Sequence, residues 1–207
     1  RIGIGTEGEI NMAKIYVVLN GRQNGIFDSW DECQKSILKF KDAAYKSFND
    51  KAEAEEFYKR NMPINPEDFK LERGTAKIFV AGSYDKKQDR YGFAYDIQMG
   101  DQTVSGSGIE PMPLVYGQQE QTGEIEAVVR AIEKARELGL YSVLVCYTHA
   151  GTGAWAIGTW NTKKDGPVYY KKGIDECIMD VRFTPVADDI PEMKTVMKMA
   201  EDILQDS

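Results

Sequence analysis

The first quarter of the sequence carries side chains that could bind a nucleic-acid backbone. They are an arginine near two glycines, a tryptophan, and a short aromatic and polar run: Arg22, Gly25, Trp30, Tyr45, Lys46, Ser47 and Phe48. Exposed loop amides and lysines bind phosphates, and aromatic rings stack on bases or sugars. The alternative is that Trp30 and Tyr45 are core aromatic residues of a small domain.

A second aromatic and basic segment spans residues 155–172. It contains a pair of tryptophans and four lysines: Trp155, Trp160, Lys163, Lys164, Lys171 and Lys172. Aromatic rings beside lysines suit a groove that follows a nucleic-acid backbone. The alternative is that the two tryptophans pack in a core and that the lysines form a solvated face.

Composition argues against several other kinds of site. The chain has a single histidine, His149, which argues against a histidine-based metal site or a serine–histidine hydrolase. Its cysteines, Cys33, Cys146 and Cys177, lie far apart and lack zinc-site spacing. We therefore expect buried thiols in a reducing, cytoplasmic compartment. The sequence contains no run of about 18 apolar residues, so we predict no membrane span.

The charge of the chain is acidic overall but unevenly distributed. The net charge is −7, whereas residues 12–60 carry nine basic and eight acidic side chains. This balance argues against a general basic coat for nucleic acid, so phosphate binding must come from local clusters. The N-terminal part is the better placed of the two for such binding.

Residues 12–60 predict a small ββαβα domain. The patterns place strands over 15–19, 26–27 and 45–48 and helices over 30–38 and 50–60. A capping box begins the first helix, because the Ser29 hydroxyl and the Glu32 carboxylate can each accept a backbone N–H. Residues 1–11 show no useful period, and we interpret them as tag or upstream sequence.

Residues 75–207 predict a larger α/β domain. Strands are expected over 76–82, 91–99, 102–108, 141–147 and 180–186, and helices over 122–138, 171–177 and 191–204, with a short helix near Ala154. Residues 61–74 are polar and contain two prolines. We predict that they form a linker between the two modules.

Residues 14–58 resemble the N-terminal hybrid-binding domain of eukaryotic-type ribonuclease H, also called the viroplasmin-like domain. The matching patterns are Y-x-V-x-x-G-R-x-x-G-I-F-x-x-W-x-E-C and A-x-Y-K-x-F. The resemblance implies binding of RNA/DNA hybrid or double-stranded RNA, with DNA-strand contacts in this chain at Trp30, Tyr45, Lys46 and Ser47. The family prefers a second lysine at the position of Ser47, which implies reduced affinity.

Residues 75–204 resemble ribonuclease H itself. The matching runs are V-A-G-S-Y-D-K-K, R-Y-G-F-A-Y, T-G-E-I-E-A-V and W-A-I-G-T-W-N-T-K-K-D-G-P-V-Y-Y-K. The resemblance implies a ribonuclease H-like mixed five-stranded sheet flanked by helices. In such relatives, the segment corresponding to residues 155–172 lies beside the DNA strand.

The resemblance also implies a metal site that this sequence does not retain. In the family, four carboxylates hold two magnesium ions, which activate water and stabilise the leaving oxygen. The corresponding positions here are Ala81, Glu124, Thr148 and Met197. Magnesium needs oxygen ligands, and three of the four carboxylates are absent. A family histidine falls on Ala187. We therefore expect an inactive domain without a metal cofactor.

Three functional hypotheses remain open. The first is a protein that binds hybrid or double-stranded RNA and uses its second domain as extra surface. The second is an active, magnesium-dependent ribonuclease H whose site is rebuilt around Glu124, with His149 as a stray ligand; the candidate replacement carboxylates are Asp85, Asp96, Asp188 and Asp189. The third is an oligomerisation or protein-docking module, which the acidity of the second domain favours.

Overall fold

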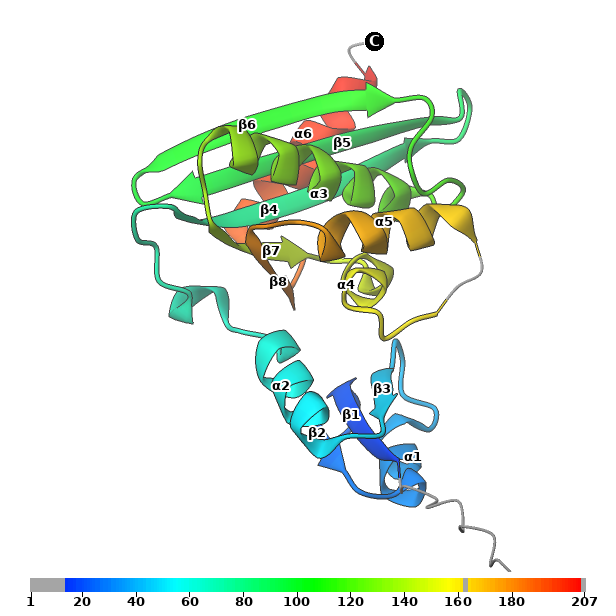
Figure 1. Cartoon of the computed structure of the whole chain (residues 1–207). Helices are drawn as coiled ribbons and strands as arrows, with labels where there is room; N and C mark the ends of the chain where they lie inside the picture. The colour runs from blue at the N-terminus through cyan, green and yellow to red at the C-terminus, as the bar shows by residue number, and fades with distance from the viewer. Residues whose placement is uncertain (1–13, 162–163, 206–207) are drawn as a thin grey trace, which may run out of the picture. The chain divides into compact units, whose positions relative to one another are not determined.

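The computed structural model describes residues 14–161 and 164–205, which belong to two compact units (Figure 1). The first unit ends at Arg60, and the second begins at Asn61. None of the helices within these ranges is long and apolar enough to cross a membrane. The segment 1–11, which we interpreted as tag or upstream sequence, lies outside the described residues.

The first unit is a three-stranded antiparallel sheet with two helices. Its elements in chain order are β1 (Ile15–Asn20), β2 (Gly25–Phe27), α1 (Trp30–Ile37), β3 (Ala44–Phe48) and α2 (Lys51–Asn61). The strand order is β2-β1-β3. Val17 and Val18 are consecutive in β1 and both are fully buried, so both faces of this strand are covered. The predicted ββαβα order is confirmed.

The second unit is built on a mixed sheet with the strand order β6-β5-β4-β7-β8. The strands are β4 (Thr75–Asp85), β5 (Arg90–Met99), β6 (Gln102–Glu110), β7 (Ser142–Tyr147) and β8 (Asp180–Pro185). The first three are joined antiparallel, whereas β7 and β8 run parallel to β4. The predicted mixed five-stranded sheet is confirmed.

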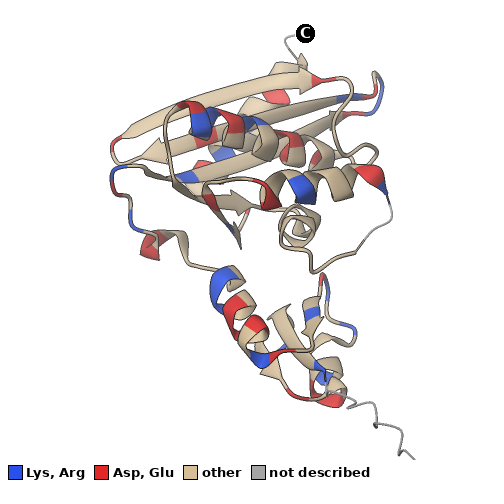
Figure 2. Ribbon diagram, in the orientation of Figure 1, with Lys and Arg blue, Asp and Glu red and all other residues tan. Residues whose placement is uncertain are grey.

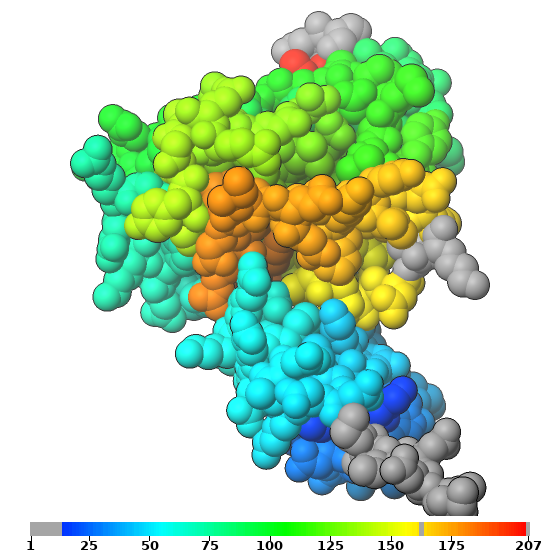
Figure 3. All heavy atoms as spheres, viewed as in Figure 1, coloured from blue at the N-terminus to red at the C-terminus, as the bar shows by residue number. Residues whose placement is uncertain are grey.

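Helices flank this sheet on both faces. They are α3 (Glu120–Glu137), α4 (Ala150–Ile157), α5 (Asp165–Asp175) and α6 (Pro191–Gln205). Figure 3 shows the outer surfaces of α3 (yellow-green) and α5 (orange) side by side. Helix α5 begins six residues before the predicted start at 171, because Pro167 falls in its first turn, where proline is tolerated.

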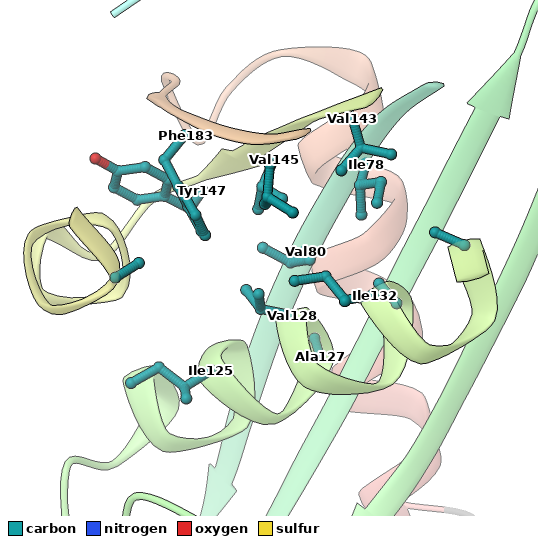
Figure 4. Close-up of a cluster of buried hydrophobic side chains, with 14 of the residues drawn as sticks. Ile78, Val80, Ile125, Ala127, Val128, Ile132, Val143, Val145, Tyr147 and Phe183 are labelled. Carbon is teal, nitrogen blue, oxygen red and sulfur yellow. The ribbon is translucent and has the colours of Figure 1, made fainter. Parts of the chain in front are cut away.

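Two apolar clusters hold the second unit together. In the larger cluster, Ile125 and Val128 of α3 pack against Val80 of β4 (Figure 4). The smaller cluster joins Phe79 of β4 to Met193 of α6. Because Phe79 and Val80 are consecutive in a strand, α3 and α6 cover opposite faces of the sheet.

The segment 61–74 packs against the second unit and differs in this from the predicted linker. It contains a short 3-10 helix, η1 (Pro66–Asp68). Ile64 and Phe69 pack against the smaller cluster, and the Thr184 hydroxyl donates to the Ile64 carbonyl at 2.7 Å. The polar, proline-containing composition of the segment did not indicate that Ile64 and Phe69 pack against the sheet.

Candidate nucleic-acid interface and carboxylate site

Three aromatic rings lie together on the first unit. Trp30 is the first residue of α1, and its ring centroid lies 5.3 Å from that of Tyr16 and 5.7 Å from that of Tyr45. The indole is 39% exposed. Trp30 is therefore a surface side chain flanked by two tyrosines and not a core residue. We call Tyr16, Trp30 and Tyr45 the aromatic group.

Tyr16 is the member of the aromatic group that our sequence prediction missed. In the sheet, Val18 of β1 pairs with Tyr45 of β3. Tyr16 lies two residues before Val18 and therefore faces the same side as Tyr45. The signal was present in the sequence, because Tyr16 opens the pattern that carries the resemblance.

Half of the capping box predicted at Trp30 is present: the Ser29 hydroxyl accepts a backbone N–H, whereas the Glu32 carboxylate accepts from the Ser29 hydroxyl in place of the predicted backbone N–H. The Glu32 N–H donates to the Ser29 hydroxyl at 3.3 Å, and this hydroxyl donates to the Glu32 carboxylate at 3.1 Å. Ser29 has extended backbone angles, so the helix begins with the next residue. This start of α1 places the indole against the rings of Tyr16 on β1 and Tyr45 on β3.

Lys46 and Ser47 lie on different faces of β3. The Lys46 Nζ lies 4.9 Å from the centroid of the Phe57 ring, on the side of the sheet that α2 covers. Because side chains alternate along a strand, Ser47 shares the face of Tyr45. Phe48 packs on Phe57, with ring centroids 5.0 Å apart, so it is a packing residue. The structure thus separates a stacking face from a cationic one.

The loop of residues 21–24, which joins β1 to β2, is hydrogen-bonded to the C-terminal end of α1. The Arg22 Nη1 donates to the Leu38 carbonyl at 2.6 Å, which stabilises the C-terminal end of the helix. The Ser36 hydroxyl donates to the Gln23 carbonyl at 2.7 Å and accepts from its N–H. Gly25 begins β2 and pairs with β1. Arg22 and Gly25 therefore shape the loop and do not join the aromatic group.

The tryptophan pair of the second unit lines a surface cavity. The rings of Trp155 and Trp160 meet edge to face, with centroids 6.3 Å apart. They line a cavity of about 310 Å³ together with Lys171 of α5. Lys164 is the N-cap residue of α5, whereas Lys163 lies outside the described residues. Trp155 also packs against the larger cluster, so its side chain both contributes to the core and lines the surface cavity.

Glu124 is fully buried in α3, and hydrogen-bonding groups surround its carboxylate. Its Oε1 accepts from the His149 N–H at 3.1 Å and from the Thr152 hydroxyl at 2.7 Å. Its Oε2 accepts from the N–H and the hydroxyl of Thr148 at 3.1 and 2.7 Å. The His149 Nδ1 lies 3.1 Å from the same oxygen. A carboxylate has about four lone-pair sites, so these partners saturate it.

The other positions that correspond to metal ligands are apolar or occupied. Ala81 is 2% exposed and belongs to the smaller cluster, against which Met197 also packs. The Thr148 hydroxyl donates to Glu124. These residues do not fit a two-magnesium site, because magnesium requires several free oxygen ligands.

The carboxylates considered as replacements do not gather around Glu124. Asp85 accepts from two N–H groups of the β4–β5 turn, at 2.9 and 3.3 Å. Asp188 and Asp189 are exposed in the turn before α6. Asp96 is buried in β5, and its Oδ1 has no hydrogen-bond partner among the described residues. Within the described ranges, no three His, Cys, Asp or Glu side chains come together to hold a metal ion.

Comparison with known proteins identifies the first unit. Residues 14–58 match the family model described as the ribonuclease H1 N-terminal domain. Over 39 residues, the chain is 49% identical to the ribonuclease H of Crithidia fasciculata, a match that covers 19% of this chain and 8% of that protein. The match thus spans less than a tenth of that relative's length.

Solved structures identify the fold of the second unit. A ribonuclease H1 from the archaeon Halobacterium salinarum matches with a TM-score of 0.53 and 15% identity, covering 65% of this chain and all of that one. The LC11 ribonuclease H1, isolated from compost by a metagenomic approach, matches with a TM-score of 0.52 and 14% identity, covering 64% and 97%. At these identities, the likeness shows the fold alone.

The chain joins a ribonuclease H1-type N-terminal domain to a ribonuclease H fold. The resemblance of residues 14–58 is thereby confirmed, and for the second unit the ribonuclease H fold is confirmed. Figure 2 shows basic and acidic residues alternating along the ribbon of α2 in the N-terminal domain and of α3 in the ribonuclease H fold. Local groups such as the aromatic group and Lys46, and not a basic coat, are therefore the candidates for nucleic-acid contact.

His149 is the titratable neighbour of the buried carboxylate in the ribonuclease H fold. Its hydrogen bond to Glu124 raises the pKa of the imidazole above its ordinary value, and partial burial opposes this effect. Protonated His149 therefore stabilises the folded state. This stabilisation is fully present below the unfolded-state pKa of about 6.5 and is lost as the pH rises through the folded-state pKa.

We predict that the melting temperature of the ribonuclease H fold falls as the pH is raised from about 6 to about 8. His149 is the only histidine in the chain, so few other groups titrate in this window. The His149→Asn variant can keep a donor near the Nδ1 position without titrating. Its calorimetric melting temperature should change less over the same range, and an equal fall in both proteins would contradict the prediction.

Proposed function

We propose that this protein binds RNA/DNA hybrid or double-stranded RNA through its N-terminal domain and does not cleave it. The observation that carries the proposal is the aromatic group of Tyr16, Trp30 and Tyr45, with Trp30 39% exposed, in a domain that matches the ribonuclease H1 N-terminal model. An exposed indole between two tyrosines offers a platform for a sugar or base.

The two faces of β3 contribute different contacts to the proposed binding. The aromatic group supplies stacking, and Lys46 supplies a positive charge for a phosphate. In the described sheet, β3 is an edge strand. A nucleic-acid backbone that runs along this edge can therefore contact side chains from both faces of β3. Contacts of this kind recognise duplex shape and the 2′-hydroxyl with little sequence preference.

The absence of cleavage is proposed from the state of the carboxylate site. Ala81 is buried among apolar side chains, and Glu124 is saturated with hydrogen bonds. The ribonuclease H fold then adds surface, for which the cavity beside Trp155 and Trp160 is the candidate. The three cysteines are free thiols, which suits the cytoplasmic location that we propose.

A labelled RNA/DNA hybrid tests this function on the full chain. We expect binding in EDTA as well as in magnesium or manganese at matched ionic strength, because no contact in the proposal uses a metal. We also expect the RNA strand to stay intact. Metal-dependent cleavage that disappears in Glu124→Gln would establish the active-enzyme alternative, and failure to bind either hybrid or double-stranded RNA would reject the proposal.

A protein-docking function is the second candidate. The loop between β6 and α3 exposes Met112 to 86% and Tyr116 to 56%. Exposed apolar side chains that lie close in sequence favour a contact with protein. Sedimentation of the wild-type chain and of Met112→Ser tests self-association through this loop.

A further inference from the structure

We infer that Glu124 acts as a structural clamp that ties α3 to the end of β7 and the start of α4, and that it does not serve as a metal ligand. The inference does not depend on nucleic-acid binding. It assigns a role to the one carboxylate that this chain retains at the positions corresponding to family metal ligands.

The backbone of α3 holds Glu124 at a fixed height above the sheet. A β-carbon on Gly82 of β4 would overlap the backbone nitrogen of Glu124, and one on Gly123 would overlap the Gly92 carbonyl of β5. The two glycines therefore allow the first turns of α3 to lie directly on the sheet. The Glu124 carboxylate has little freedom to move toward another partner.

The clamp connects several elements through one carboxylate. Thr148 follows β7, His149 is the N-cap residue of α4, and Thr152 lies in the first turn of α4. The N-terminus of a helix leaves N–H groups unpaired and attracts negative charge. The Tyr170 hydroxyl of α5 donates to the Thr152 carbonyl at 3.1 Å, so α5 is held to the same turn.

An amide cannot replace this carboxylate. Oε2 faces the Thr148 N–H and Oε1 faces the His149 N–H. Either orientation of a glutamine side chain therefore points its NH2 group at a backbone donor. A hydroxyl can rotate and an imidazole can change its tautomer, but a backbone N–H can do neither. One buried donor is left without an acceptor.

A clamp and a metal ligand predict opposite responses. A carboxylate that waits for a metal gains stability when the metal binds, because the ion stabilises only the folded state. A saturated carboxylate must lose several hydrogen bonds before it can bind an ion. Metal should then leave the wild type unchanged, whereas neutralising the carboxylate should destabilise the protein without any metal.

The test compares full-length wild type, Glu124→Gln and Glu120→Gln by calorimetry in EDTA and in millimolar magnesium or manganese. Glu120 lies on the same helix and is exposed, so its variant controls for the charge change. We expect Glu124→Gln to lower the melting temperature by about 5 to 10 °C. We expect Glu120→Gln and either metal to change it by about 1 °C or less.

Hydrogen exchange locates the effect. Amides of residues 148–157 should exchange faster in Glu124→Gln than in wild type, because they lose the group that holds the start of α4. Thr152→Val removes one of the hydrogen bonds and should give a smaller change of the same kind, even if Glu124→Gln does not fold. The inference is overturned if Glu124→Gln is as stable as wild type in EDTA and metal raises the wild-type melting temperature.

Discussion

The Trp30→Ala variant is expected to bind RNA/DNA hybrid about 5- to 150-fold more weakly than wild type. The indole is 39% exposed between Tyr16 and Tyr45, so its removal deletes the centre of the aromatic group. Stacking on one aromatic side chain contributes about 1 to 3 kcal/mol, which corresponds to this loss in affinity. Fluorescence anisotropy with a labelled hybrid measures it.

Salt dependence separates the two faces of β3. Lys46→Ala removes one phosphate contact and should reduce the slope of log affinity against log salt by about 0.9. Trp30→Ala should leave this slope unchanged, because stacking releases no counterions. The double variant should bind most weakly, since the two contacts lie on different faces of the strand.

Controls keep this prediction specific. Lys51→Ala removes a positive charge at the exposed start of α2 and should change affinity much less than Lys46→Ala. Trp30→Phe retains a smaller ring and should lie between wild type and Trp30→Ala. Circular dichroism must show that each variant is folded. Unchanged affinity in the folded double variant would reject the binding surface that we propose.

The elements of both units were predictable because their signals are local. Ser29 caps the N-terminus of α1 as expected, and the alternation in residues 91–99 corresponds to β5. The start of α5 was predicted six residues too late, at 171 and not at Asp165, although a helix tolerates Pro167 in its first turn. Such errors concern boundaries, which depend on the last turn of each element.

The candidate site was less predictable because it depends on contacts between distant residues. Alternation alone could have separated Lys46 from Tyr45, since neighbours in a strand face opposite sides. No local pattern, however, shows that Arg22 turns toward the end of α1 or that Thr152 reaches Glu124. The sequence identified a missing ligand at Ala81, and only the structure shows that apolar packing fills this position.

Restoring a carboxylate at this position should therefore damage the fold and not rebuild a metal site. Ala81 is 2% exposed and packs with Met193, Val196 and Ala200 of α6. Cys146 belongs to the same cluster, and burial raises the pKa of its thiol to about 12. The environment thus disfavours a negative charge, and we expect Ala81→Asp to lower the free energy of unfolding by about 3 to 5 kcal/mol.

Urea unfolding of Ala81→Asp and Ala81→Asn measures this cost and isolates the charge. The two side chains have the same shape, so the difference in their stability reports the buried carboxylate. Burial should raise the pKa of the introduced Asp carboxyl in the folded state. The carboxyl then lowers the free energy of unfolding most at a pH where it is ionised in the unfolded chain. The difference between the two variants should therefore shrink as the pH falls toward the ordinary range of an aspartate, about 4. If magnesium or manganese instead restores the stability of Ala81→Asp to that of wild type, Glu124 can still share a metal with a neighbouring carboxylate, and the proposal that this fold has lost its metal site is wrong.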